Sequence, residues 1–342
     1  MSVRKLIKAF LVLGAIAAAT VVLYLRVSSR IIDADRIITE AFMHNDKSNY
    51  IALVETEIAY MGKKLQAKAR ILHSGNNEKI IRLGPEHESA WSITKNGTTY
   101  TYLPKDKILL ISNSNHSEAN RQRIRLLLSN YRVACIGEES VAGHKAYLIE
   151  IRSRRFGITS KKLWIDKRHH TLLRSVDYSA TGEKRGIMNT IRISYNTRID
   201  PAEFDISSLD PSVRKLIVCR PAEPANLSRT LKISLHPPKY VPKGYISEGH
   251  YLYNSQCNCN HRSAQLTYTD GLNTFSVFET PINQPCRGTK CNMLLEDSGH
   301  KGCELQGCEM ARTGQIRRGN KIVTVVGDLA SKEIRRIAES VQ

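Results

Sequence analysis

The sequence predicts an α+β protein in which antiparallel strands outnumber helices. Between Gly143 and Tyr195, four apolar or alternating runs have the period of strands, at 146–151, 163–165, 172–178 and 191–195. The polar connectors between them are too short for the crossover that parallel neighbours need, so these strands form an antiparallel meander. Helical spacing of apolar residues is confined to three stretches, at 33–45, 118–131 and 329–341.

The first part of the chain predicts one long antiparallel sheet with two helices. Asp33 is the expected N-cap of the first helix, and strands are predicted at 50–61, 65–73, 79–83, 91–94, 98–103 and 107–111. Asn96-Gly97 is a strong signal for a two-residue hairpin turn. A further strand carries Val133, and the domain closes around Phe204. A long curved sheet with helices on one face encloses a hollow that suits an apolar ligand.

The second part predicts a smaller α+β domain. Pro221 and Pro224 indicate a linker. Strands are then predicted at 231–235, 244–253, 264–269, 274–279, 315–318 and 321–326, followed by a helix from Leu329 with Asp328 as its cap. The predicted divisions are an N-terminal segment at 1–30, a first domain at 31–219, a linker at 220–230, and a second domain at 231–342 with a cysteine-rich insert at 281–310.

The charge of the chain favours an anionic partner. The formal net charge is +19, and the stretch from Lys145 to Arg198 holds 13 Lys or Arg residues against four Asp or Glu residues. Such a field attracts phospholipid head groups, lipopolysaccharide phosphates or an acidic protein, although it also suits a well-solvated surface. An aromatic content of 6% and the lack of a nucleic-acid-binding motif argue against nucleic acid.

The N-terminus predicts export. Basic residues precede an apolar run from Ala9 to Leu25, and Arg26 follows it. As a helix this run spans about 25 Å, close to the bilayer core of about 30 Å. It is either an uncleaved anchor in the inner membrane, which we favour, or a signal peptide cleaved after Ser29. Either way, the residues after Ile31 are expected outside the cytoplasm, in the periplasm.

Outside the cytoplasm, eight cysteines predict disulfide bonds. Six lie close together in the sequence, as Cys257, Cys259, Cys286, Cys291, Cys303 and Cys308. A zinc or iron–sulfur site is the first alternative, but the spacings lack the paired C-x2-C motifs of such sites. Reduced thiols are the second. We expect no cofactor otherwise.

Candidate binding residues lie on the first sheet. Residues expected to face an apolar cavity are Ile51, Leu53, Ile58, Tyr60, Leu65, Ile71, Tyr100, Tyr102, Leu148 and Trp164. Cations expected near its mouth, to contact an anionic head group or an acidic protein, are Arg152, Arg154, Arg155, Lys161 and Lys162. Each apolar residue is also compatible with ordinary core packing. His169 and His170 are expected in an exposed turn that begins at Asp166.

No catalytic pattern is found. The sequence contains no nucleophile elbow, P-loop or metalloprotease helix, and its Ser, Asp and Glu residues never take a spacing that catalysis requires. The chain is therefore predicted to bind rather than to catalyse.

Several motifs resemble one known family. "LLLSNYRVACIGEESVAGHKAYLIEI" and "KLWIDKRHHTLLRSVDYSATGE" resemble the N-terminal domain of MucB/RseB regulators of the extracytoplasmic stress sigma factor, and "YTDGLNTFSVFE" and "IVTVVGDLASKEIRRIAESV" resemble their second domain. The resemblance implies a first domain similar to the lipoprotein carrier LolA, a half-open barrel with helices covering an apolar cavity. It also implies a periplasmic sensor that binds an anti-sigma factor and is displaced by lipopolysaccharide or lipoprotein.

Two departures from the family leave alternatives open. The family generally has a cleaved signal and lacks the cysteine-rich insert. The insert implies that the partner of the second domain can differ from that of the family. A lipid or lipoprotein carrier on the same fold is the first alternative function, although an uncleaved anchor disfavours a carrier, which must leave the membrane. A cysteine-ligated metal or redox protein is the second, but it leaves the basic meander unexplained.

Overall fold

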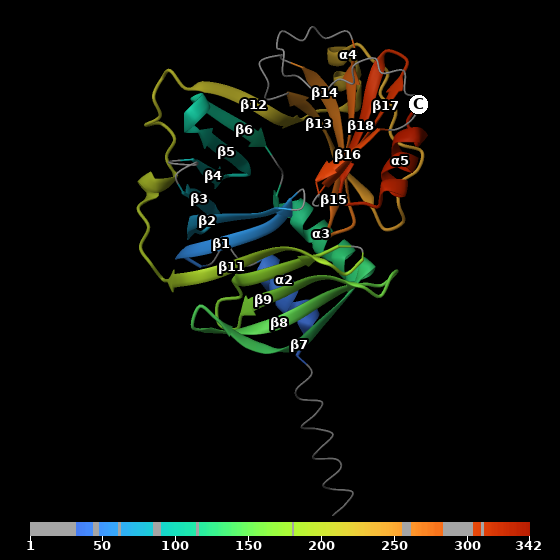
Figure 1. The fold of residues 1–342 in the computed structure, drawn as a ribbon. Coiled ribbons are helices and arrows are strands. Elements are labelled where there is room, and N and C mark those ends of the chain that lie inside the picture. The colour runs from blue at the N-terminus through green and yellow to red at the C-terminus, as the bar shows by residue number, and fades with distance from the viewer. Residues whose placement is uncertain are drawn as a thin grey trace, which may run out of the picture.

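The computed structural model describes most of the chain after residue 31 (Figure 1). The described residues are 32–43, 48–60, 63–84, 90–113, 116–179, 181–254, 261–282, 304–308 and 311–342. The apolar run at 9–25 therefore lies outside them. Among the helices that are described, none has the length and hydropathy needed to cross a membrane.

Eighteen strands form one continuous hydrogen-bonded sheet. In chain order they are β1 Tyr50–Tyr60, β2 Lys63–Ser74, β3 Asn77–Leu83, β4 Trp91–Lys95, β5 Thr98–Leu103, β6 Ile108–Asn113, β7 Tyr131–Val141, β8 His144–Ser153, β9 Thr159–Asp166, β10 Leu172–Tyr178, β11 Lys184–Tyr195, β12 Arg214–Pro221, β13 Ile246–Asn254, β14 Arg262–Thr269, β15 Thr274–Pro281, β16 Glu304–Cys308, β17 Ala311–Arg318 and β18 Lys321–Gly327.

The pairing of these strands gives the sheet its two parts. The first runs β7–β8–β9–β10–β11–β1–β2–β3–β4–β5–β6, with every pair antiparallel. The second runs β13–β14–β15–β18–β17–β16, also antiparallel. Strand β12 joins them, because it pairs in parallel with β6 and antiparallel with β13. The expected α+β class with a large antiparallel sheet is confirmed.

In the described part of the chain, four α-helices accompany the strands: α2 Ala34–Met43, α3 His116–Asn130, α4 Pro224–Leu231 and α5 Ser331–Ser340. Asp33 caps α2 as predicted, since its Oδ1 accepts the Arg36 N–H at 3.0 Å. The short 3-10 helices η3 Pro104–Asp106 and η4 Pro201–Phe204 complete the elements. Helix α3 lies between the two parts of the sheet (Figure 1).

The predicted meander and hairpin form as the sequence indicates. Strands β8 to β11 are consecutive antiparallel neighbours. Asn96 and Gly97 connect β4 and β5 with φ values of 50° and 73°. A two-residue turn with both central residues at positive φ matches the twist of the paired strands.

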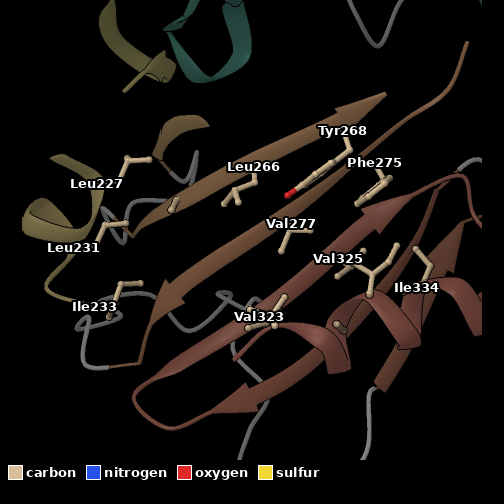
Figure 2. Packing of buried hydrophobic residues seen from close by; sticks show 14 of the residues in the cluster. Leu227, Leu231, Ile233, Leu266, Tyr268, Phe275, Val277, Val323, Val325 and Ile334 are labelled. Carbon is tan, nitrogen blue, oxygen red and sulfur yellow. The ribbon is translucent and has the colours of Figure 1, made fainter. Parts of the chain in front are cut away.

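The part of the chain predicted as the second domain has a single core, shown in Figure 2. Helices α4 and α5 pack leucine and isoleucine side chains against the sheet, and the stacked rings of Tyr268 and Phe275 lie 4.8 Å apart in the same cluster. The part predicted as the first domain instead divides its buried residues among three smaller clusters. Different segments cover its long sheet: α2 and α3 pack in one cluster, and η4 packs in another.

The stretch at 220–230 differs from the predicted linker. Pro221 ends strand β12, and Pro224 begins helix α4, where its missing N–H costs nothing. Leu227 and Leu231 are 1% and 6% exposed in the second core. The predicted strand from Leu231 is likewise wrong: that residue ends α4, because the apolar spacing of this stretch fits a helix.

The predicted cap of the last helix is also wrong. Helix α5 starts at Ser331, and its N-cap residue is Ala330, without a side-chain hydrogen bond. Asp328 instead forms an ion pair with Arg185 of strand β11. Of the residues expected on the buried face of the helix, Ile334, Ile337, Ala338 and Val341 are buried, whereas Ala330, the N-cap, is exposed.

Candidate binding surfaces

Helices α2 and α3 cover one face of the meander. The strand residues beneath them are Ile149, Ile151, Leu163 and Ile165. Side chains alternate along a strand, so Leu148 and Trp164 point to the opposite face. These two candidate residues are direct neighbours in the β8–β9 register.

Two polar neighbours fix the side chain of Trp164. Its Nε1 donates to Glu139 Oε2 at 2.7 Å, and the Arg174 guanidinium lies 4.6 Å from the ring centroid. The ring is 6% exposed, within a cluster against which Ile71 and Leu148 also pack. Three of the ten apolar candidates therefore meet in one packed cluster.

The other apolar candidates lie elsewhere. Ile51 packs on a separate cluster with Leu72 and Phe204 of η4, and Tyr102 of β5 lies 5.6 Å from the ring of Trp91. Leu65 is 46% exposed. Leu53, Ile58 and Tyr100 are half-buried, and the side chain of Tyr60 lies outside the described residues. The ten residues are thus spread over several sites.

A pocket of about 270 Å³ lies across β1, β2, β10 and β11. Its lining is mostly polar: Glu55, Thr56, Glu57, Gln66, Ala67, Lys68, Arg174, Ile187 and Asn189. The Arg174 Nε is buried there without a hydrogen-bond partner among the described residues. Such a lining suits a polar ligand better than an alkyl chain.

Two of the five basic candidates are neutralised within the protein. Arg152 forms an ion pair with Glu150 at 2.9 Å, and Lys161 pairs with Asp177 at 2.7 Å. Arg154 donates to a backbone carbonyl, that of Leu128, at 3.4 Å. Arg155 lies over the ring of Phe156. Lys162 is half-buried on β9, opposite Glu150 in the register.

The turn after β9 begins at Asp166, as predicted. The buried carboxylate accepts the Arg168 and His169 N–H groups at 2.7 and 2.8 Å. His169 stacks on Tyr195 at 3.8 Å, and His170 lies 3.1 Å from Glu40 of α2. Both histidines are half-buried rather than exposed, because the turn packs against these neighbours.

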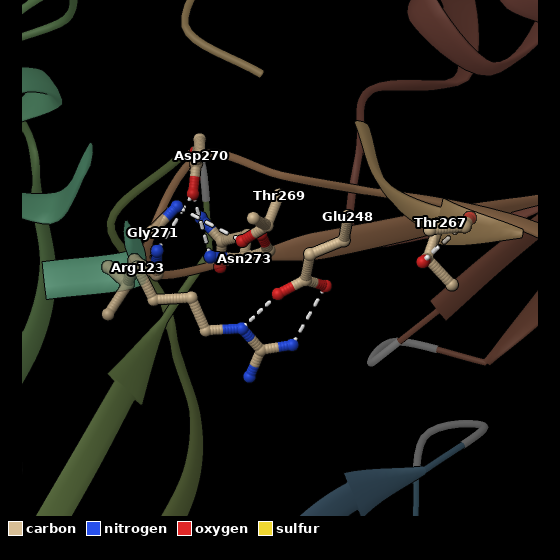
Figure 3. A network of polar contacts seen from close by, with 9 residues as sticks. Arg123, Glu248, Thr267, Thr269, Asp270, Gly271 and Asn273 are labelled. Atoms are coloured by element: carbon tan, nitrogen blue, oxygen red, sulfur yellow. Dashed lines mark hydrogen bonds and ion pairs between the residues drawn. The ribbon is translucent and has the colours of Figure 1, made fainter. Parts of the chain in front are cut away.

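The two parts of the sheet meet at a polar joint that the sequence did not reveal. It consists of the end of α3, the start of β7, and the β14–β15 turn at 270–273, with part of it shown in Figure 3. The Asn130 Nδ2 donates to the carbonyls of Gly244 and Asp270, both at 2.9 Å. Arg123 forms a bidentate ion pair with Glu248.

Tyr131 is the buried centre of this joint. Its hydroxyl donates to Asp270 Oδ2 at 2.6 Å and accepts from Asn273 Nδ2 at 2.9 Å. Burial, and then the Asp270 charge, raise the pKa of Tyr131 far above its ordinary value, so the phenol stays a proton donor. These residues are about 140 positions apart, and only the Asp-Gly turn was visible in the sequence.

Gly271 allows the close approach at the joint. Its φ is +96°, and an added Cβ would lie 2.2 Å from the backbone nitrogen of Leu127. Only glycine fits this backbone conformation and this space.

The predicted disulfide residues lie largely outside the description. Cys257, Cys259, Cys286, Cys291 and Cys303 are outside the described residues, and for Cys308 only the backbone of β16 is described. Cys135 and Cys219, which are described, are free thiols. Within the described ranges, no three His, Cys, Asp or Glu side chains gather as a metal site would require.

Solved structures of MucB share this fold. MucB in complex with MucA(peri) superposes with a TM-score of 0.62 at 16% identity, covering 91% of this chain and 98% of MucB. The MucA/MucB complex of Pseudomonas aeruginosa gives 0.61 at 16% identity, covering 91% and 99%, and MucB alone gives 0.57 at 17%, covering 90% and 97%.

The sequence itself points to the same family. Residues 59–207 match the model of the MucB/RseB N-terminal domain. Residues 59–207 therefore form a domain of the MucB/RseB N-terminal type, as the motifs of this stretch indicated. Among curated protein sequences, none matches it.

Proposed function

We propose that this protein is a non-enzymatic extracytoplasmic sensor that binds an anti-sigma factor and so regulates an envelope-stress sigma factor. The observation that carries this proposal is the match of residues 59–207 to the MucB/RseB N-terminal domain. The fold adds support, because it covers 98% of the MucB chain that was solved in complex with MucA(peri).

The polar joint supports a sensing role. In a sensor, ligand binding must favour one of two arrangements of the protein. The two domains here have separate cores and meet through individual hydrogen bonds such as that of Tyr131 to Asp270. A small polar interface of this kind is the usual setting for relative domain motion.

Release by lipid or lipoprotein is the finer part of the proposal. We assign the acyl-binding face to the first sheet, read as a half-barrel, and start from the three candidates that pack together, Ile71, Leu148 and Trp164. The cysteines of the 281–310 insert are assigned to disulfides. Anchoring by residues 9–25 would keep the protein beside a membrane-embedded partner.

Co-purification tests the central claim. The full chain is co-expressed with the anti-sigma factor encoded in the same genome, in detergent, and its complex is isolated through a tag on either partner. We expect a complex of defined stoichiometry, and slower proteolysis of the outer segment of the anti-sigma factor. No complex and unchanged proteolysis would reject the proposal.

A matched pair of variants tests the role of the joint in binding. Tyr131→Phe removes the hydroxyl at the joint, whereas Tyr147→Phe removes one from a half-buried residue of β8 that is not among the candidate binding residues. If the two domains bind the partner together, Tyr131→Phe weakens binding and Tyr147→Phe does not. Equal affinities would place the partner on one domain alone.

A further inference from the structure

The turn between β8 and β9 presents an aromatic ring to solvent. Residues 154–157 are all exposed, and the side chain of Phe156 is 65% exposed. The turn is well fixed: Gly157 N–H donates to the Ser153 carbonyl at 2.8 Å, and Phe156 N–H donates to Ser153 Oγ at 3.3 Å. Phe156 is therefore held outward by the backbone.

Positive charge surrounds this ring. Between Glu150 and Asp166 the sequence has five basic residues and no acidic one. Arg152 and Lys161 are ion-paired with Glu150 and Asp177. Arg154 and Arg155 are exposed, and the Arg155 guanidinium lies 5.0 Å from the centroid of Phe156. The local field at the turn is thus cationic.

The same combination continues on the second domain. The Arg336 guanidinium of α5 lies 3.7 Å from the centroid of the Tyr240 ring. The two places are adjacent, because the Arg154 N–H donates to the Asn130 carbonyl at 3.1 Å and the Asn130 Nδ2 donates to the Gly244 carbonyl at 2.9 Å. The Tyr240 hydroxyl donates to Glu333 at 2.6 Å. Lys239 and Lys243, near Tyr240 in the chain, are exposed. Glu333 adds an acidic group to this surface.

We propose that this surface, made of Arg154, Arg155, Phe156, Tyr240 and Arg336, docks on an anionic phospholipid membrane. An exposed ring beside arginines matches the membrane interface, where the ring enters the headgroup boundary and the guanidinium groups reach lipid phosphates. Each Lys or Arg at an anionic surface adds to binding. A peptide partner would need a groove to bury its side chains, whereas Phe156 stands on an exposed turn.

This inference goes beyond the proposed sensor function. It rests on that function in one respect: the extracytoplasmic location decides which side of the membrane the turn faces. It places the β8–β9 turn, rather than the face of the sheet, against the lipid.

A tryptophan introduced into the turn tests the contact. The full chain carrying Phe156→Trp is mixed with vesicles of phosphatidylglycerol and phosphatidylcholine that contain brominated lipid, which quenches tryptophan on contact. The unmodified chain supplies the background from Trp91 and Trp164. The apolar run at 9–25 can by itself bind the chain to vesicles. The probe must therefore show which part of the protein contacts the lipid, and not only that the protein binds.

Ile217→Trp is the matched control. Ile217 is 45% exposed on β12, which lies far from β8 and β9 in Figure 1. For the Phe156→Trp chain we expect quenching of the introduced indole in anionic vesicles and little in pure phosphatidylcholine. For the Ile217→Trp chain we expect no quenching above background. Adding Arg154→Gln and Arg155→Gln is expected to weaken the contact by about 30-fold, from two charges at an anionic surface.

Three outcomes would overturn the proposal. Equal quenching in the Phe156→Trp and Ile217→Trp chains would mean that docking is not specific to the turn. Absence of quenching in the Phe156→Trp chain would mean that the turn does not meet lipid. Quenching that is unchanged by the arginine substitutions would show that the arginines do not bind an anionic headgroup. Binding of the anti-sigma factor is measured separately, so its failure beside retained quenching would reject the sensor function and leave the docking surface.

Discussion

The two domains are joined in two physically different ways. Strand β12 joins them through the backbone, with register pairs to β6 from Arg214 to Cys219 and to β13 from Cys219 to Pro221. The joint at α3 uses side chains, among them Asn130, Tyr131 and Asp270. Backbone pairing accepts most side chains, whereas each side-chain bond of the joint depends on one residue. The first connection is therefore structural, and under the proposed function the second is the one that a ligand would open.

Breaking the backbone connection has the largest expected effect. Cys219 is paired on both sides, with Ser112 and Tyr253. Cys219→Pro removes an N–H from a strand with two neighbours, so we expect it to lower the free energy of unfolding by more than about 3 kcal/mol. The control is Glu223→Pro, where φ is already −69°. Urea unfolding followed by circular dichroism measures both, and equal stability of the two variants would contradict the role of β12.

Gly271→Ala is expected to disrupt the side-chain joint. The positive φ and the contact of the new Cβ with backbone atoms of α3 are expected to cost about 2–3 kcal/mol. Both tryptophans lie in the first domain, so fluorescence follows that domain and circular dichroism follows both. We expect the two transitions to separate in this variant.

Gly319→Ala is the control for backbone strain alone. Its φ is +56°, but no atom of the described residues lies within 4 Å of an added Cβ. If both alanine variants keep coincident transitions, the joint does not couple the domains.

Tyr131→Phe tests one bond of the joint. Removing the hydroxyl takes from the buried Asp270 carboxylate a donor at 2.6 Å, which we expect to cost about 2 kcal/mol. Because the pKa of Tyr131 is raised, the phenol donates over the whole neutral range, and the loss should not vary between about pH 6 and 9. A loss of stability that changes steeply within this pH range would contradict the assignment of the proton to the Tyr131 hydroxyl.

The reactivity of the Cys219 thiol measures whether strand β12 stays paired, without a substitution in that strand. Burial raises its pKa from 9.0 to about 11, so at about pH 8 the thiolate is about 100-fold scarcer than for an ordinary thiol. We expect iodoacetamide to alkylate it correspondingly slowly, as mass spectrometry would show. In Gly271→Ala this protection should persist, since β12 stays paired. Rapid alkylation there would mean that the two connections open together.

Local signals in the sequence predicted most elements, because they depend on near neighbours. The apolar run around Trp164, the cap at Asp33 and the Asn96-Gly97 turn each lie within a few residues of what they determine. The stretch after Pro221 failed for the same reason. Its prolines resemble a linker, but the burial of Leu227 and Leu231 against a distant sheet makes it a helix.

The candidate sites were harder to predict. Leu148 and Trp164 were expected to share a face, and their strand register brings them together. Leu65 and Ile51 were chosen by the same alternation, yet they lie at other places on a sheet whose curvature one strand does not reveal. The joint of Tyr131 with Asp270 depends on a contact across 139 residues, for which a single sequence holds no signal.

The position of β1 has a consequence for truncation and assembly. Although it is the first strand in the chain, it lies inside the sheet, between β11 and β2, and its partner β11 is more than a hundred residues away. The first domain therefore cannot close until β11 has been made, which favours slow folding. A proteolytic cut that removed β1 would split the sheet and expose two unpaired strand edges, β11 and β2, each able to pair with another molecule.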